Sequence, residues 1–127
     1  MTNITLKTSL LATLALPLVA CEFHARSAED YRDVTQALLD TKAAEIQACY
    51  DTALNGQPGL SGRVTVQFTV EAETGRLKDV RVDPAGTTAP ETLSMCVTNA
   101  VSALALTPPD KRDGIATWVY DFTPSAG

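Results

Sequence analysis

Three cysteines in different settings constrain this chain more than any other feature of its sequence. Cys21 ends an apolar N-terminal stretch, whereas Cys49 and Cys96 each lie among the apolar positions of a predicted helix. A disulfide between Cys49 and Cys96 would close a loop of 47 positions. Closing this loop lowers the conformational entropy of the unfolded chain, which would raise the free energy of unfolding by about 4 kcal/mol. That is a large share of the stability of a small domain, typically about 5 to 15 kcal/mol.

The N-terminal segment has the pattern of an export signal. Lys7 is the only charged residue among the first twenty, and residues 9–20 are almost entirely Leu, Ala and Val. A helix of that length spans about 18 Å, too short for a hydrocarbon core of about 30 Å. We therefore expect residues 1–20 to be a lipoprotein signal peptide that is removed, and not a transmembrane anchor.

The segment Leu18-Val19-Ala20-Cys21 resembles the lipobox of bacterial lipoproteins. The resemblance implies that Cys21 is acylated, with palmitate among the expected chains, and becomes the first residue after cleavage. Several acyl chains anchor a protein firmly, whereas one is marginal. We expect a lipid-anchored protein on the periplasmic side of the envelope, and Glu22 favours the outer over the inner membrane. The alternative is ordinary cleavage that leaves Cys21 as a free thiol.

Export would place Cys49 and Cys96 in an oxidising compartment, where paired thiols persist as disulfides. The alternative is that both stay reduced and pack as small hydrophobic side chains. A redox or metal role has less support, because the sequence has no Cys-x-x-Cys motif and no histidine near either residue. We therefore expect a disulfide, no metal site and no cofactor.

Length and charge limit the class of function. Removal of residues 1–20 leaves 107 of the 127 residues, enough for one small domain. The formal net charge moves from −5 to −6, because Lys7 is lost. Binding to nucleic acid requires a basic face, and none is visible in the sequence. Nucleic acid is therefore not an expected partner.

The apolar pattern predicts an α+β domain over residues 43–127. Residues 21–42 are rich in charge and are expected to form a lipidated, partly helical tether. The predicted elements are a helix from about residue 42 to 56, strands over 63–70 and 76–82, a helix from about 91 to 104 and a strand over 115–122. We expect a three-stranded antiparallel sheet in the order 2-1-3, with both helices on one face and the third strand at an edge.

Local signals add detail to the connections. Gly75 is expected to take a positive φ in the turn between the first two strands, and Leu77 falls out of phase with the strand that follows, which indicates a bulge there. The segment from Thr88 to Glu91 fits a capping box, in which the Thr side chain would begin the second helix.

Longer stretches resemble a known family. Residues 49–54, 58–70, 75–77 and 80–82 are similar to the AgmX/PglI C-terminal domain, a TonB C-terminal-like domain, and Cys96 is similar to the second cysteine of that family. The similarity covers about residues 43–122. One departure is the segment 104–108, which replaces a Trp-x-Phe-Pro-like segment of the family.

The resemblance implies a non-catalytic protein-binding adaptor. Related domains bind an extended peptide at a free sheet edge, where main-chain hydrogen bonds supply affinity. The expected partner is an envelope protein or peptide, and the alternative function is a peptidoglycan-binding, glycan-binding or purely structural envelope module. The candidate edge residues are Thr117, Trp118, Val119, Tyr120, Asp121 and Phe122. We expect Trp118, Tyr120 and Phe122 to face the core, which leaves recognition to the backbone.

An enzyme is not expected. The single histidine, His24, lies three positions from the predicted lipidation site, a poor place for a preorganised catalytic group. The aspartates are scattered near strand ends and turns, where Asp commonly bonds the local backbone. No glycine-rich phosphate loop is present. The sequence therefore predicts no catalytic residues.

Overall fold

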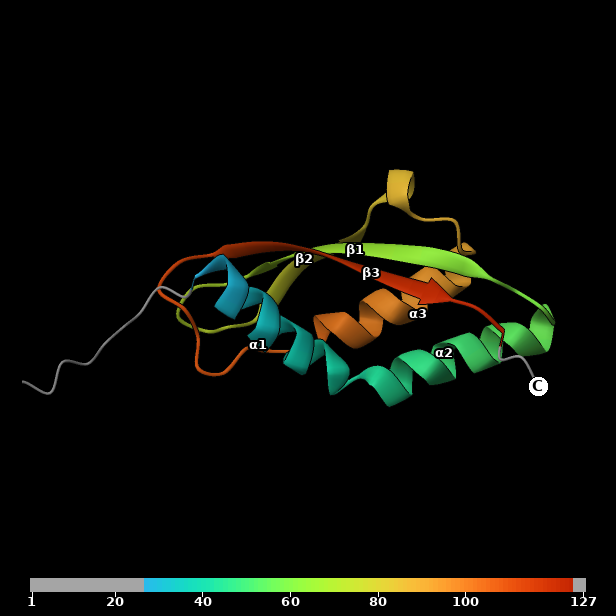
Figure 1. Cartoon of the computed structure of the whole chain (residues 1–127), viewed down its shortest axis with the longest axis horizontal. Coiled ribbons are helices and arrows are strands. Elements are labelled where there is room, and N and C mark those ends of the chain that lie inside the picture. The colour runs from blue at the N-terminus through green and yellow to red at the C-terminus, as the bar shows by residue number, and fades with distance from the viewer. Residues whose placement is uncertain (1–26, 125–127) are drawn as a thin grey trace, which may run out of the picture.

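The computed structural model describes residues 27–124 as a sheet covered on one face by helices (Figure 1). The elements are α1 (Ala28–Asp40), α2 (Ala43–Gly56), β1 (Gly62–Val70), β2 (Leu77–Val82), the short 3-10 turn η1 (Pro84–Gly86), α3 (Glu91–Ser102) and β3 (Gly114–Phe122). All strand pairs are antiparallel, in the order β2-β1-β3. The predicted fold class and strand order are confirmed. The predicted signal peptide, the lipidation site Cys21 and His24 lie outside the described residues.

The alternating pattern of β1 creates the centre of the core. Its apolar residues Val64, Val66, Phe68 and Val70 are at most 2% exposed and face the helices. The residues between them form the opposite face of the sheet. Figure 1 shows α1, α2 and α3 on one side of the sheet and η1 alone on the other. The sheet thus has one apolar face, as the period of two predicted.

A disulfide between Cys49 and Cys96 joins α2 to α3, with their Cα atoms 5.8 Å apart. The predicted disulfide is therefore confirmed. Around it, Ile46 and Tyr50 of α2 and Val97 of α3 are at most 4% exposed within the same core. The Tyr50 hydroxyl donates a hydrogen bond to the Leu60 carbonyl, which satisfies its polar end inside the core.

Part of the segment expected as a tether is a helix that joins the core. Ser27 caps α1 by accepting a hydrogen bond from the Asp30 N–H at 3.1 Å. Thr35 and Leu39 of α1 are each only 2% exposed, and Leu39 lies in the central apolar cluster. A turn at residues 41–42 separates α1 from α2. The helical face therefore carries three helices, one more than predicted.

The hairpin between β1 and β2 contains a glycine with positive φ and a bulge, and the bulge lies farther along β2 than predicted. Gly75 has φ +70°, as expected for its turn. The bulge lies at Asp79–Val80 and not at Leu77, since the register shifts between Gln67 and Thr69 of β1. Asp79 adopts φ +52°, a conformation that Asp tolerates better than most residues, while Leu77 stays buried.

The predicted capping box does not form. Helix α3 begins after Pro90 with no side-chain cap, and the Thr88 hydroxyl instead accepts a hydrogen bond from the Arg63 N–H at 2.9 Å. Thr87 accepts one from the Thr65 N–H at 3.0 Å. Because β2 ends at Val82, the start of β1 needs other acceptors, and this loop supplies them.

Candidate functional site

Strand β3 forms one edge of the sheet and is the longest unpaired edge in the part of the chain that the structure describes. It pairs with β1 over its whole length, from Gly114 opposite Val70 to Phe122 opposite Gly62. No strand among residues 27–124 pairs with its outer side. All six predicted edge residues, 117–122, belong to this strand.

The register identifies the main-chain groups that face outward from β3. Arg63 and Thr65 direct their N–H groups away from β3, toward Thr88 and Thr87. In an antiparallel pair, opposite residues either bond to each other or both point away. Arg63 lies opposite Asp121 and Thr65 opposite Val119, and every second residue of β3 follows the same rule. The outward-facing residues are Ile115, Thr117, Val119 and Asp121.

The side chains of β3 divide between the two faces of the sheet. Trp118 and Tyr120 are half-buried against the core, and Phe122 is 8% exposed with its ring centroid 5.1 Å from that of Tyr50. These side chains face the core as predicted. On the opposite face, Ile115 is 84% exposed and Val119 46% exposed. An added strand would therefore meet apolar side chains at alternate positions.

Helix α1 borders the first half of β3. A cavity of about 460 Å³ lies between them, which we call the edge notch. Its lining consists of Ala28, Tyr31, Arg32 and Thr35 of α1 and residues 114–118 of β3. A Cβ atom on Gly114 would collide with the Tyr31 ring, so the ring could not keep this position against a larger residue. Sequence reasoning missed α1 as part of the site.

The opposite edge, β2, is shorter and partly covered. The Leu77 N–H donates to the Leu104 carbonyl at 3.2 Å, and the Leu106 N–H donates to the Gly75 carbonyl at 2.7 Å. Beyond this covered part, the bulge at Asp79 interrupts the strand. Bulges and covering segments of this kind prevent strand pairing. The two edges of the sheet are therefore unequal.

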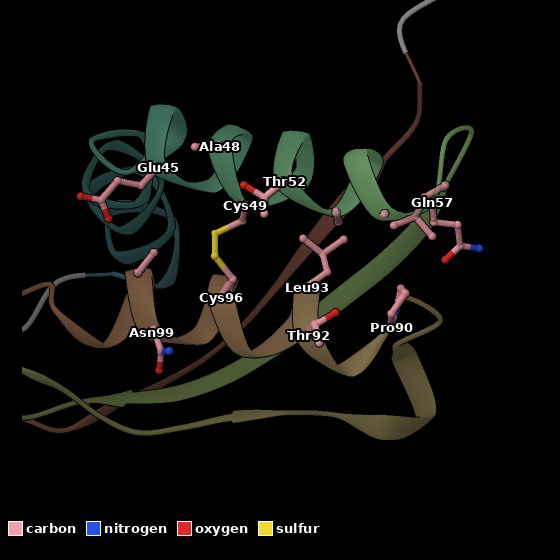
Figure 2. A pocket seen from close by; sticks show the side chains of 14 residues that line it. Glu45, Ala48, Cys49, Thr52, Gln57, Pro90, Thr92, Leu93, Cys96 and Asn99 are labelled. Carbon is pink, nitrogen blue, oxygen red and sulfur yellow. A yellow bond between two sulfur atoms is a disulfide. The ribbon is translucent and has the colours of Figure 1, made fainter.

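A second cavity, a groove of about 770 Å³, lies between α2 and α3 (Figure 2). The disulfide bridges it, Leu93 and Ala100 contribute apolar surface, and Glu45 is the only titratable residue in its lining. Residues 27–124 hold no cluster of three or more potential metal-ligating side chains. None of the helices in this range is long and apolar enough to cross a membrane. The groove is therefore lined mainly by apolar and uncharged polar side chains.

Three charged side chains at the ends of β3 and on β1 are held by neighbouring groups: Arg63, Asp113 and Asp121. Arg63 and Asp121 form an ion pair at 2.7 Å, and the hydrogen bond to Asp121 raises the pKa of Arg63. Asp113 accepts a hydrogen bond from the Ala72 N–H at 2.7 Å, which lowers the pKa of its carboxyl group. Lys78 lies 3.6 Å from Asp113. These exposed pairs orient the ends of β3, and exposed pairs of this kind contribute little to stability.

Tyr120 predicts a pH dependence of stability. Burial, reinforced by the nearby charge of Asp40, raises the pKa of Tyr120 to about 12 from 10.0. Above pH 10 the unfolded state loses the Tyr120 proton while the folded state retains it. The free energy of unfolding is therefore unaffected by this group below the ordinary pKa of 10.0 and falls as pH rises toward about 12. The Tyr120 hydroxyl has no hydrogen-bond partner within residues 27–124. We expect Tyr120→Phe to leave stability at neutral pH unchanged or raised, and to weaken the alkaline loss measured by chemical denaturation.

Comparison with known proteins identifies no family. No family model matches the chain, and no curated protein matches it. The chain is similar to the solution structure of the TonB C-terminal domain of Helicobacter pylori, with 14% sequence identity and a TM-score of 0.47. The similar region covers 82% of this chain and 100% of that domain. Similarity at this level gives no information about what this chain binds.

Proposed function

We propose that this chain is an envelope lipoprotein whose folded domain is a non-catalytic adaptor for an extended segment of another envelope protein. Acylated Cys21 holds it on a membrane, with the outer membrane favoured, and the partner segment pairs with the outer side of β3. Membership of the AgmX/PglI C-terminal family is part of the proposal and rests on sequence resemblance alone. The observation that carries the binding proposal is the nine-residue β3 strand with no strand on its outer side among the described residues.

The geometry of this edge supports binding by strand addition. The main-chain groups of Ile115, Thr117, Val119 and Asp121 supply donors and acceptors at regular spacing. Each hydrogen bond contributes about 1 kcal/mol net, because it replaces bonds to water. The exposed side chains of Ile115 and Val119 lie beside alternate residues of the added strand, where cross-strand apolar pairs add about 0.2 to 1 kcal/mol each. The backbone therefore supplies affinity that does not depend on the partner's sequence, and the side chains supply selectivity.

The edge is tested by Val119→Pro, with Val119→Thr as the matched control. The Val119 N–H faces outward, so proline removes a donor from the free edge while the bonds to β1 remain. The probe is a synthetic peptide of alternating valine and threonine with one central glutamate. Its binding is measured from the shifts of the backbone amide NMR signals of the domain. We expect saturable shifts along β3 in the parent and control proteins, and at least about tenfold weaker binding by the proline variant.

Two results would contradict the edge proposal. One is an absence of peptide-induced shifts along β3 at millimolar peptide, with the domain folded. The other is peptide binding that Val119→Pro leaves unchanged, with shifts confined to the groove between α2 and α3. Sedimentation of the purified domain with cell-wall sacculi would favour the glycan-binding alternative.

Lipidation is tested by intact mass spectrometry of membrane-extracted protein. We expect the parent chain to begin at residue 21, to carry acyl chains, and to have the mass of a protein with one disulfide. Cys21→Ser should abolish acylation and release the protein from the membrane fraction, because the chains supply most of the membrane affinity. Full-length, unmodified parent protein in the cytosol would contradict the anchoring proposal.

A further inference from the structure

One face of α1 is turned toward the outer edge of β3. Ala28, Tyr31, Arg32 and Thr35 are spaced three and four residues apart, so they occupy one side of the helix, and all line the edge notch. On the strand side, Gly114 and Ala116 share the helix-facing side with Trp118. The Tyr31 ring occupies the space over Gly114, and the small side chain of Ala116 leaves room beside α1. A strand added to β3 would direct alternate side chains into this space.

Thr35 supplies an observation independent of the cavity. It is 2% exposed, and its hydroxyl has no hydrogen-bond partner within residues 27–124. Threonine inside a helix commonly bonds to a preceding carbonyl, and a buried hydroxyl without a partner is unfavourable. Thr35 lines the notch, but its hydroxyl is closed to solvent, so a bound group would reach this unpartnered donor only if the contact between α1 and β3 opens locally.

Arg32 supplies a charge at the mouth of the same cavity. Its side chain is exposed and makes no ion pair with any residue of the described range, in contrast to Arg63, which is paired with Asp121. A guanidinium group binds a carboxylate with two parallel hydrogen bonds. A cation beside an open strand edge favours an acidic side chain on the segment that binds there.

We propose that the edge notch selects partner segments by receiving the carboxylate of a glutamate side chain, with Arg32 and Thr35 as the donors. This inference rests on the proposed function, because the partner must first pair with β3. The glutamate would lie on the helix-facing side of the added strand, opposite Ala116. Apolar residues on its other face would lie next to Ile115 and Val119.

A second copy of this chain fits the edge less well. In the antiparallel register that brings Ile115 opposite Val119 of the second copy, Asp113 lies opposite Asp121 of the second copy. Like charges directly opposite each other destabilise strand pairing. This pairing also places no carboxylate in the notch. A partner segment with a glutamate satisfies both donors.

The test compares the glutamate probe described above with peptides that carry glutamine or lysine at the same position. In the parent protein we expect the glutamate peptide to bind at least about tenfold more tightly than the glutamine peptide. Arg32→Glu should reverse the order, so that the lysine peptide binds best. Arg81→Gln, on the opposite edge, serves as the matched control and should keep the parent order.

Thr35→Val tests the buried donor separately from protein folding. Valine has a similar shape and removes the unpaired hydroxyl, so the free protein should be as stable as the parent or more stable. The preference for glutamate over glutamine should nevertheless fall severalfold. Thermal unfolding of each variant shows whether a loss of preference comes from the missing hydroxyl or from a protein that no longer folds.

The outcomes separate this inference from the function on which it rests. Equal binding of the glutamate and glutamine peptides along β3 would overturn the notch proposal and leave strand addition intact. A parent preference that Arg32→Glu and Thr35→Val leave unchanged would also overturn it. Absence of shifts along β3 with every peptide would overturn both proposals. Concentration-dependent shifts of β3 without peptide would indicate pairing with a second copy and would count against both.

Discussion

Replacing Cys49 and Cys96 together by alanine is expected to lower the free energy of unfolding by about 4 kcal/mol. The covalent bond joins α2 to α3 across 47 positions, so its loss releases the unfolded chain from a long closed loop. Cys49 is also 8% exposed within the core, and truncation to alanine removes packing there. A small domain would retain only part of its stability without this bond.

Urea unfolding of the oxidised parent, the reduced parent and the double variant measures this effect. We expect the reduced parent and the double variant to unfold at similar, much lower urea concentrations than the oxidised parent. Since the core contacts of Val97 and Ile46 remain, all three proteins should still fold in the absence of denaturant at low temperature. Equal midpoints for the oxidised parent and the double variant would contradict a stabilising role for the disulfide.

Gly75→Ala is the second change with a large expected effect, a loss of about 3 kcal/mol. Gly75 has φ +70°, and a Cβ atom there would collide with the Leu106 carbonyl group. The Gly75 carbonyl also accepts the Leu106 N–H at 2.7 Å, so any shift that relieves the collision breaks this pairing. The segment after α3 would lose its attachment to the hairpin.

Gly59→Ala is the control for backbone conformation alone. Gly59 has φ +81°, similar to Gly75, but no atom lies within 4 Å of its Cβ position. We expect this variant to lose only about 1 kcal/mol, the cost of a left-handed conformation for a residue with a side chain. Thermal unfolding of both variants measures the difference. Equal losses would show that the contact with Leu106 adds nothing.

The sheet could be predicted from the sequence because its signals are periodic. The alternation from Val64 to Val70 defined the central strand, and the long helical connection defined the strand order that the structure confirms. The disulfide was predictable once export was inferred from the N-terminal pattern. The central strand, the strand order and the disulfide were each predicted from a single sequence pattern.

The errors have a common cause, which is that tertiary contacts override local sequence patterns. The sequence around Thr88 satisfies the capping-box pattern, but β1 uses that hydroxyl instead. The segment of α1 was expected as a partly helical tether because it is rich in charge; the helix forms, but the burial of Leu39 and Thr35 depends on contacts distant in sequence. Local patterns do not contain these contacts.

The candidate edge was predictable, but its selectivity was not. The third strand was expected at an edge because a long connection returns it beside the first strand. Its outward-facing residues follow only from the register with β1, and the notch follows only from the position of α1. The spacing of Tyr31 and Thr35 on one helical face was the available signal, and it gives no indication of what that face contacts.

The inequality of the two sheet edges limits how large an assembly of this domain can become. Growth of a fibre by successive strand addition requires every molecule to offer two competent sides, one to each neighbour. Here the β2 side is obstructed by the bulge at Asp79 and by the segment from Leu104 to Leu106. A molecule that pairs with another through β3 therefore offers no second competent edge, so successive strand addition stops after one pairing.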